Sequence, residues 1–412
     1  MKKLLILGAN PETAMLVKTA QKMGVYTIVV DGIPGSFAKK IADESFDIDG
    51  MDVDRLADLV GQEGIDGVIV GTADPLIRPY RELCERTGLP CYAGKQASLV
   101  LTDKRLFKDK CIEYGIEGVP EYSLDECLSG AVEYPLIVKP ADGRSGKGMT
   151  LCYNSSELDG AISKAKEFSR SGEYIIEQYM GDCEDVFTYY TFKDGKCFLS
   201  AMADRYTTKE QSGAAPVVLG AVYPSEHLNE YLRVLHPKMC EMFKGLQIED
   251  GVLLIQFFYN NGKFYPYDPG FRLQGGAPHL LVANINGFDH REMLVNFALT
   301  GNMGDTDLEE MNDPGFKGKA AASQTILLRR GKIKRIEGID TISRKPEVIA
   351  TTQRLWEGDD VFLEGTEQQV LVRFHMVCET MVEMRKLMKE INSTVKAYDT
   401  EEKNMCLGGL TV

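Results

Sequence analysis

The 412 residues are enough for two or three domains of ordinary size. A hydrophobic fraction of 44% and a charged fraction of 26% exclude a disordered or collagen-like chain. No run of about 18 apolar residues occurs, so no membrane-spanning segment is expected. The net charge, 47 minus 61 or −14, argues against a nucleic-acid partner but leaves room for a local basic pocket.

The ten cysteines are scattered from Cys84 to Cys406 with no C-x-x-C pair. This spacing favours free thiols in a reducing compartment over a zinc site or a disulfide framework. The apolar run at the start, residues 3–7, is too short for the core of a signal peptide and indicates a first buried strand. We therefore expect a cytoplasmic protein.

Residues 1–100 alternate apolar runs with amphipathic segments. Strands without apolar/polar alternation, separated by helices, predict a parallel, Rossmann-like sheet covered on both faces. Its ligands are expected at the carboxyl ends of the strands, near Gly8, Asp31 and Thr72 to Asp74. The predicted strands are 3–7, 26–30 and 67–70, and the predicted helices are 12–23, 53–60 and 76–84.

A dinucleotide-binding domain is one alternative for this region. Asp31 follows Gly8 by about the distance typical of a ribose-binding acid. The glycine fingerprint is absent, however, because Ala, Asn, Pro, Glu and Thr follow Gly8. An NAD(P) oxidoreductase is therefore the weakest of the functional interpretations.

From about residue 101 to 301 the pattern changes to antiparallel signals. Asp194-Gly195 and Asn260-Asn261-Gly262 each separate two apolar runs, which predicts two hairpins. The pattern over residues 226–246 predicts a long helical stretch. This region is therefore expected to be an α+β domain built mostly on antiparallel sheet.

A glycine-rich loop follows the predicted strand 134–138. The strand delivers Lys139, and the loop continues through residues 141–149 with three glycines and the cations Arg144 and Lys147. Exposed N–H groups and cations suit a polyphosphate, although the Walker A pattern is not met. Alone, such a loop is a weak signal.

Two further segments are suited to a nucleotide. Lys104 opens a helix directly after Asp103. The apolar strand 174–180 runs into a polar stretch that can offer hydrogen bonds to an adenine, and Glu184 follows where an acid can accept ribose hydroxyls.

The second predicted hairpin carries oxygen ligands and a cation. Gln256 and Asp268 lie on its paired strands and can point to one face, as oxygen donors for a hard cation such as magnesium. Arg272 follows closely and can hold a second anion through two parallel hydrogen bonds. His279, just beyond Gly275-Gly276, is a candidate for substrate contact.

Taken in this order, these features resemble the ATP-grasp superfamily, and the resemblance covers essentially the whole chain. It implies an N-terminal domain over 1–100, an ATP-grasp domain over 101–305 and a small C-terminal lobe over 306–412. It implies ATP with magnesium or manganese as the nucleotide and metal, and a homodimer as in many relatives. The residues that match the superfamily's positions are Lys104 and Lys139 for the phosphates, Ser145, Gly146, Lys147, Gly148 and Met149 for the mobile loop, Glu177, Tyr179 and Met180 for the adenine, Glu184 for the ribose, Gln256 and Asp268 for the metal, and Arg272, with Lys139, for catalysis.

Two positions depart from the superfamily's usual pattern. The first metal position is usually Glu and is Gln256 here, and the second motif reads Asp-Pro-Gly-Phe-Arg over 268–272. The site therefore has one certain carboxylate. Among the reactions of the superfamily, ligation of a small-molecule carboxylate to an amine, through an acyl phosphate, is the one we expect. A bicarbonate-using carboxylase or carbamoyl-phosphate-synthase-like enzyme and a non-enzymatic nucleotide sensor are the alternatives.

The last hundred residues give weaker signals. A strand is expected over 320–329 and a turn at Gly331-Lys332. A helix-period run is expected from Val370 to Ile391, with His375 as a satisfied core histidine.

Overall fold

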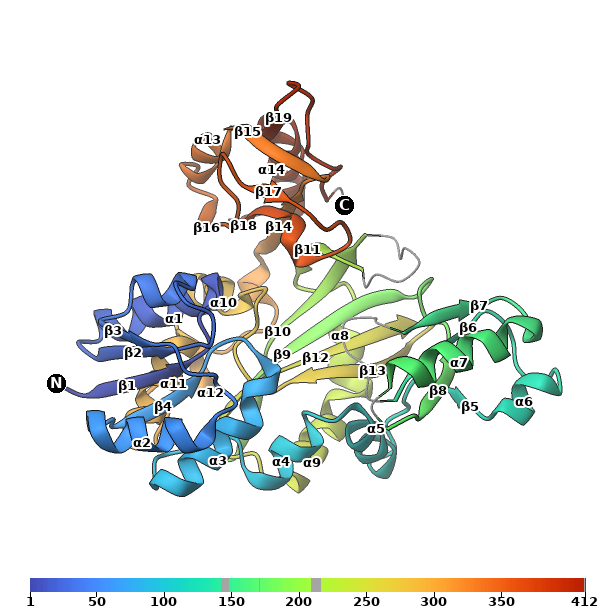
Figure 1. The fold of residues 1–412 in the computed structure, drawn as a ribbon, viewed down its shortest axis with the longest axis horizontal. Helices are drawn as coiled ribbons and strands as arrows, with labels where there is room; N and C mark the ends of the chain where they lie inside the picture. Colours follow the sequence, from blue (N-terminus) through green and yellow to red (C-terminus); the bar gives the residue numbers. More distant parts are fainter. Residues whose placement is uncertain (142–147, 170, 209–215, 411) are drawn as a thin grey trace.

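The computed structural model describes residues 1–141, 148–169, 171–208, 216–410 and 412. Its described strands form four sheets. In Figure 1 the N-terminal parallel sheet lies at the left, a large antiparallel sheet lies at the centre and a smaller sheet lies at the right, while the C-terminal elements rise above the centre. This mixed architecture confirms the predicted fold class.

The N-terminal sheet has the order β3-β2-β1-β4, and all its pairs are parallel. The apolar runs of β1, β2 and β4 are buried almost throughout, because helices cover both faces of the sheet. Asn10 caps the first helix by accepting a 2.8 Å hydrogen bond from the Thr13 amide. The elements are β1 (Lys3–Leu7), α1 (Pro11–Lys22), β2 (Tyr26–Val30), β3 (Glu44–Phe46), α2 (Val53–Glu63), β4 (Gly67–Val70) and α3 (Ile77–Thr87).

One helix of this domain comes from much later in the chain. Helix α11 (His290–Thr300) packs against α1, β1 and β4. Gly67 allows this contact, since a Cβ at this position would lie 2.3 Å from the Ala298 carbonyl oxygen. The N-terminal sheet is therefore covered in part by a helix from the end of the predicted ATP-grasp region.

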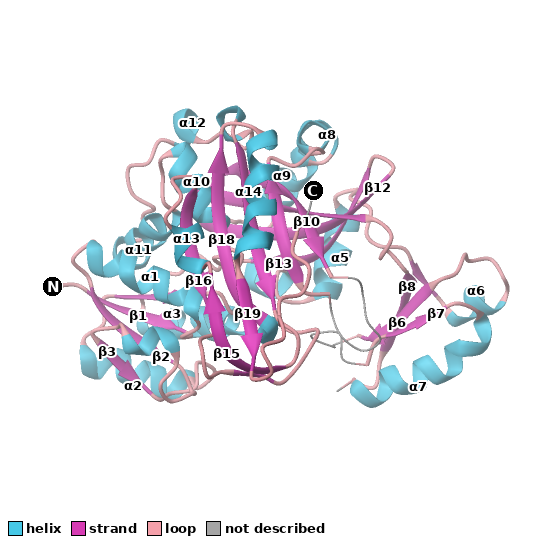
Figure 2. Ribbon diagram, turned by 90° about the horizontal axis from the view of Figure 1, so that it is seen from above, coloured by secondary structure: helices cyan, strands magenta, loops and turns pink. Residues whose placement is uncertain are grey.

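The large sheet has eight antiparallel strands in the order β13-β12-β9-β10-β11-β14-β18-β16. Figure 2 shows it from above, with helix α14 (Met381–Thr394) lying across it. Three of its strands belong to the last hundred residues, so the sheet runs across the predicted boundary at residue 305. The division into domains stays a prediction. The strands are β9 (Glu184–Lys193), β10 (Lys196–Thr207), β11 (Val218–Tyr223), β12 (Gly251–Asn260), β13 (Lys263–Gly270), β14 (Ala320–Leu327), β16 (Val348–Gln353) and β18 (Val370–Cys378).

Both predicted hairpins are present in this sheet. Asp194 and Gly195 have φ of 51° and 73°, and Asn261 and Gly262 have φ of 49° and 82°. Tight hairpin turns with this twist require positive φ at both central residues, which Asp, Asn and Gly tolerate. The turn chemistry thus sets the pairing of β9 with β10 and of β12 with β13.

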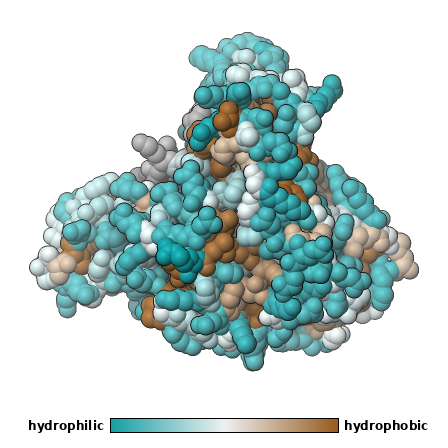
Figure 3. All heavy atoms as spheres, turned by 180° about the vertical axis from the view of Figure 1, so that it is seen from behind, coloured by the Kyte–Doolittle hydropathy of each residue, from teal (hydrophilic) through white to brown (hydrophobic). Residues whose placement is uncertain are grey.

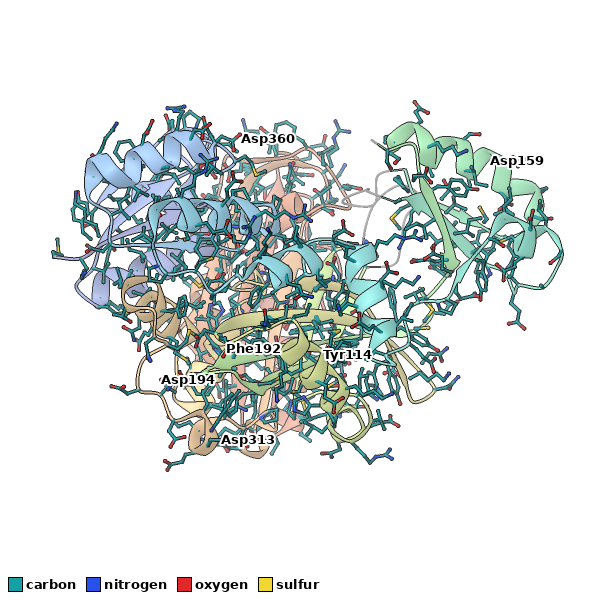
Figure 4. The ribbon with its side chains drawn as sticks, turned by 90° about the horizontal axis from the view of Figure 1, so that it is seen from below. Tyr114, Asp159, Phe192, Asp194, Asp313 and Asp360 are labelled. Atoms are coloured by element: carbon teal, nitrogen blue, oxygen red, sulfur yellow. The ribbon has the colours of Figure 1, made fainter. Side chains whose placement is uncertain are left out.

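A smaller antiparallel sheet, in the order β5-β8-β6-β7, lies beside the large one. Figure 4 views the molecule from below, with Asp159 on the outer helix of this smaller unit and Phe192 on the large sheet. Helix α5 precedes both sheets in the chain and packs against β13 of the large sheet. The elements are α5 (Lys104–Glu113), β5 (Glu121–Tyr122), α6 (Leu124–Leu128), β6 (Leu136–Pro140), β7 (Thr150–Cys152), α7 (Leu158–Phe168) and β8 (Tyr174–Gln178).

The predicted helix-period run over 370–391 is wrong in its first half. Val370–Cys378 is strand β18, and the helix α14 begins only at Met381. The strand is buried on both faces, so its apolar residues do not alternate, and such a run is hard to distinguish from a buried helix. The predicted turn at Gly331-Lys332 is also wrong, because these residues begin strand β15.

The remaining elements include the strands of the fourth sheet, whose order is β17-β15-β19. The long helical stretch expected over 226–246 is two helices, α8 (Leu228–Val234) and α9 (His236–Gly245). The others are α4 (Lys95–Val100), α10 (Pro278–Asn286), α12 (Leu308–Met311), α13 (Ile339–Ser343), β15 (Gly331–Glu337), β17 (Asp360–Val361) and β19 (Lys396–Asp399), with 3-10 turns at Phe37–Lys40, Asp74–Leu76, Ser155–Glu157, Phe316–Gly318 and Glu367–Gln369.

The surface and the thiols agree with the composition. Hydrophilic residues cover most of the face seen in Figure 3, with hydrophobic atoms gathered mainly near its middle. All ten cysteines are free, as predicted, and half of them are buried. Within the described part of the chain, no helix is both long enough and apolar enough to cross a membrane.

A buried ion pair joins the N-terminal domain to the last hundred residues. Glu12, in the first turn of α1, has a side chain only 3% exposed and pairs with Arg354. It also lies 3.7 Å from Arg373 on β18, a guanidinium that is itself buried. Since charges this deep must be compensated, the pair fixes how β18 sits against α1.

Replacing Glu12 with Ala should destabilise the protein by about 3 kcal/mol, because two arginines lose their buried partner. The shift in the urea midpoint measures this loss. Glu309→Ala is the matched control, since Glu309 pairs with Lys196 at the surface and its loss should cost about 1 kcal/mol or less. Equal shifts in the two variants would contradict the role given to Glu12.

Candidate functional site

The smaller sheet brings Lys139 and Glu177 together. Lys139 on β6 opposes Ile175, and Glu177 on β8 opposes Ile137, so the two side chains lie diagonally on one face of the sheet. The Lys139 ammonium pairs with the Glu177 carboxylate, whose side chain is only 10% exposed. The predicted phosphate lysine and the predicted adenine residue are therefore direct neighbours.

Helix α5 supplies two more lysines. Lys108 Nζ lies 3.3 Å from a Glu177 oxygen and 3.0 Å from Glu121 on β5. Lys104, at the start of the helix, reaches the other sheet and lies 2.8 Å from Asp268 on β13. The helix thus spans the two sheets with a cation at each, and Lys104 meets the predicted metal ligand.

Part of the predicted mobile loop lies outside the described residues, namely Ser145, Gly146 and Lys147. Gly148 and Met149 are described and lead into β7. Gly148 has φ +76°, and a Cβ there would lie 2.6 Å from the Phe168 side chain, so only glycine fits without rearrangement. This close contact fixes the end of the loop against α7.

Tyr179 and Met180 follow β8, where the adenine is predicted. The Tyr179 amide donates to the Pro135 carbonyl at 3.2 Å, and Met180 is buried. These contacts hold the segment against the start of β6. The adenine role of both residues stays a prediction.

The structure separates Glu184 from the other predicted residues. Glu184 opposes Tyr259 and Asp185 opposes Phe258, so these neighbouring acids point to opposite faces of the large sheet. Glu184 lies 2.8 Å from His227, whose ring stacks on Tyr259 at 3.7 Å. Asp185 is the acid on the face that carries Gln256 and Asp268.

Gln256 and Asp268 oppose each other across β12 and β13, as the sequence predicts. A bulge follows Gln256 and turns Tyr267 toward it. The Gln256 Oε1 atom accepts hydrogen bonds from Tyr267 Oη and from Arg205 Nη1, both at 2.6 Å. Arg205 Nη1 also lies 2.7 Å from Asp185 and 2.9 Å from Tyr267 Oη.

Burial shapes the electrostatics of this network. It raises the pKa of the Asp185 carboxyl to about 6, against the opposing effect of Arg205. Burial also disfavours the charged Arg205 guanidinium, but Tyr267, Asp185 and Asp268 together raise the pKa of Arg205 above its ordinary value. Arg205 therefore carries a permanent positive charge beside Asp268.

The donor set fits one divalent cation better than two. Asp268 is a half-exposed carboxylate whose partner, Lys104, is largely exposed and free to move aside. Both lone pairs of Gln256 Oε1 are already used in hydrogen bonds. In the part of the chain that the structure describes, no group of three His, Cys, Asp or Glu side chains is placed to hold a metal ion.

Arg272, two residues after the end of β13, links this strand to the N-terminal domain. It pairs with Asp74, which follows β4 at the carboxyl end of the parallel sheet. Asn10 and Thr72, from the loops after β1 and β4, share a 2.6 Å hydrogen bond beside it. The predicted catalytic arginine thus faces the strand ends where ligands of parallel sheets bind.

The segment after Arg272 is held by buried groups of β18. Arg373 donates to the Gly275 carbonyl at 2.8 Å, and His375 Nε2 donates to the Gly276 carbonyl at 2.8 Å. Burial lowers the pKa of His375 to about 4, so its ring is neutral near pH 7 and only Nε2 carries a proton. His375 is therefore a core histidine, as predicted, and one that positions the Gly275-Gly276 segment.

His279 is more deeply placed than a substrate-contacting residue should be. Its side chain is buried, and neither ring nitrogen has a hydrogen-bond partner among the described residues. Burial lowers its pKa well below the ordinary value. Substrate contact by His279 stays a prediction.

Sequence reasoning missed Arg205, Lys108 and Asp185. Arg205 sits in a strand with no motif around it, and only the register of β10 against β9 brings it to the site. Lys108 lies one helical turn after Lys104, and this spacing predicts that the two lysines share one face of the helix. Asp185 lies next to the predicted Glu184, and the alternation of the strand decides between them.

Comparisons with known proteins bear on the middle of the chain and on its fold. A family model described as the ATP-binding domain of the carbamoyl-phosphate synthase L chain matches residues 103–293. A formate-dependent phosphoribosylglycinamide formyltransferase from Wolinella succinogenes is 26% identical over 201 residues, which are 47% of this chain and 51% of the relative. The chain thus matches about half the length of this curated relative.

Solved structures share the fold over nearly the whole chain. Phosphoribosylglycinamide synthetase from Anaerococcus prevotii has a TM-score of 0.77 at 16% identity and covers 97% of this chain and 100% of its own. An L-amino acid ligase from Bacillus licheniformis has the same TM-score and identity and covers 97% and 99%. The matched segment contains Lys104, Lys139, Glu177, Asp268 and Arg272. Residues 103–293 therefore match the ATP-binding domain that the family model describes, and the chain as a whole shares the ATP-grasp fold of these solved structures.

Proposed function

We propose that this protein is an ATP-dependent ligase that activates a small-molecule carboxylate as an acyl phosphate for attack by an amine. The observation that carries the proposal is the ion pair of Arg272 with Asp74. It joins the strand of the predicted metal ligand to the loops at the strand ends of the N-terminal sheet. A small substrate held at those loops lies next to the nucleotide site.

A carboxylate is a poor electrophile because its charge is delocalised and oxide is a poor leaving group. In the proposed reaction a carboxylate oxygen attacks the terminal phosphorus of ATP and ADP leaves. The amine nitrogen then attacks the acyl carbon, the C–O bond to phosphate breaks, and the departing phosphate accepts the proton that the nitrogen loses. Phosphoryl transfer of this kind depends on positioning and charge neutralisation, and it needs no nucleophilic side chain.

The chain's own residues have distinct tasks in this scheme. Lys139 and Lys104 hold the phosphates, and Glu177 with the segment of Tyr179 and Met180 holds the adenine. A magnesium ion bound at Asp268 supplies positive charge to the phosphates. Arg272 stabilises the charge of the acyl phosphate and of the tetrahedral adduct.

Each lysine already has a carboxylate partner, which supports this assignment. Lys139 has Glu177 and Lys104 has Asp268. The pair with the buried Glu177 holds the Lys139 ammonium in place, so less side-chain entropy is lost when the phosphates bind. We further propose that the protein is cytoplasmic and forms a homodimer. Light scattering of the purified protein measures its oligomeric state.

With Mg-ATP, ADP release should require a carboxylate and an amine together. The assay is a panel of amino acids, other carboxylates and bicarbonate, each with and without an amine. Release with bicarbonate alone would assign the protein to a carboxylase-type reaction. ATP binding without release under any condition would favour a nucleotide sensor.

Asp268→Asn should reduce turnover at least 100-fold while leaving the fold intact, because a neutral amide binds Mg²⁺ far more weakly than a carboxylate. ADP release and thermal unfolding of the same preparation measure the two effects. ATP hydrolysis at the wild-type rate would contradict the metal role of Asp268.

Lys139→Ala should weaken ATP binding by about 1.5–3 kcal/mol, the scale of a hydrogen bond to a charged group. The fold should persist, since Lys108 still pairs with Glu177. Isothermal titration calorimetry measures the affinity. Lys196→Ala, at the exposed β9–β10 turn, is the control and should bind ATP as the wild type does. Equal affinities for the two variants would contradict the phosphate role of Lys139.

A further inference from the structure

We propose that the site binds a single divalent cation, at Asp268. In place of a second cation, the Arg205 guanidinium supplies positive charge to the phosphates of the nucleotide. The inference rests on the proposed nucleotide binding and goes beyond it. It concerns the departure at Gln256, where the superfamily usually has a carboxylate.

The position of Gln256 is closed to a metal ion by its own hydrogen bonds. An amide oxygen has two lone pairs, and those of Gln256 accept from Arg205 and from Tyr267 at 2.6 Å each. A cation would have to displace both donors, and one of them is positively charged. A second cation at this position would therefore be repelled by Arg205 as well as poorly ligated.

Arg205 is held firmly enough to serve as a fixed charge. It lies opposite Asp185 in the β9–β10 pairing, and the two are joined at 2.7 Å with side chains 15% and 16% exposed. Gln256 and Tyr267 orient the same nitrogen, Nη1. A guanidinium fixed by three neighbours loses little freedom when an anion binds to it.

Arg205 also keeps donors for an anion. Its hydrogen bonds to the described residues all start from Nη1, which leaves Nη2 and Nε without partners in this part of the chain. Arg205, Gln256 and Asp268 share one face of the sheet, because Gln256 opposes both Asp268 and Phe187, and Phe187 opposes Ala203, two residues before Arg205. The guanidinium therefore stands beside the cation site at Asp268, with planar N–H donors that suit phosphate oxygens.

Mn²⁺ counts the cations directly. One equivalent of a non-hydrolysable ATP analogue is added to concentrated protein, and free Mn²⁺ is followed by electron paramagnetic resonance. We expect one Mn²⁺ per chain in the complex, and two would overturn the inference. Absence of analogue binding would instead overturn the proposed function, so the two failures are distinguishable.

A pair of variants tests the phosphate contact. Asp185→Asn keeps Arg205, while Asp185→Asn with Arg205→Met removes the guanidinium without leaving a buried unpaired carboxylate. The double variant should bind the ATP analogue at least 10-fold more weakly than Asp185→Asn, and both should bind adenosine equally. Equal analogue affinities, or an equal loss for adenosine, would overturn the role of Arg205.

A gain of function tests the closure. Gln256→Glu combined with Arg205→Met places three carboxylates together, those of residues 185, 256 and 268, and removes the cation among them. This variant should bind a second Mn²⁺ in the presence of the analogue. A single Mn²⁺ in the folded variant would show that Arg205 does not close the position.

Discussion

The antiparallel pairing of β12 with β13 brings together the groups on which the site depends. It sets Gln256 directly opposite Asp268. The bulge beside this pair turns the Tyr267 hydroxyl back toward Gln256. The same pairing ends at Gly270, so Arg272 leaves the sheet toward Asp74 of the N-terminal domain. One hairpin thus positions the proposed cation ligand Asp268, the network around it and the proposed catalytic residue Arg272.

Around this hairpin, each cation of the site is held by a carboxylate from another part of the chain. Lys139 meets Glu177, Lys104 meets Asp268, Arg205 meets Asp185 and Arg272 meets Asp74. Lys139, Arg205 and Arg272 are largely buried, and buried charges are costly unless they are paired, so their pairs stabilise the site and orient these three cations. In the proposed reaction the polyanionic nucleotide takes these cations over from their carboxylates, and cations already in place lower the barrier by electrostatic preorganisation.

The N-terminal domain and the last hundred residues meet near Arg272, on the proposed substrate side. Glu12 of α1 pairs with Arg354 and lies near Arg373 of β18, and Arg373 in turn holds the Gly275 carbonyl after Arg272. The segment that follows the predicted catalytic arginine is therefore fixed by residues about 100 positions later. The long sheet that crosses residue 305 places β18 where Arg373 and His375 hold the Gly275 and Gly276 carbonyls.

Local patterns in the chain were sufficient for much of this protein. The apolar runs of β1, β2 and β4 and the turn residues Asp194 and Asn261 predicted the parallel sheet and both hairpins, because each depends on residues close in sequence. The ordered motif residues from Lys104 to Arg272 predicted the ATP-grasp fold through their resemblance to that superfamily. Tertiary structure decided the rest. Val370–Cys378 is a strand because it is buried on both faces, and that burial comes from partners far along the chain. Asp185, and not Glu184, faces Gln256 because the register of β9 against β12 selects one of two adjacent acids. Arg205 enters the site only through the pairing of β10 with β9, and no local pattern reports a contact made across strands.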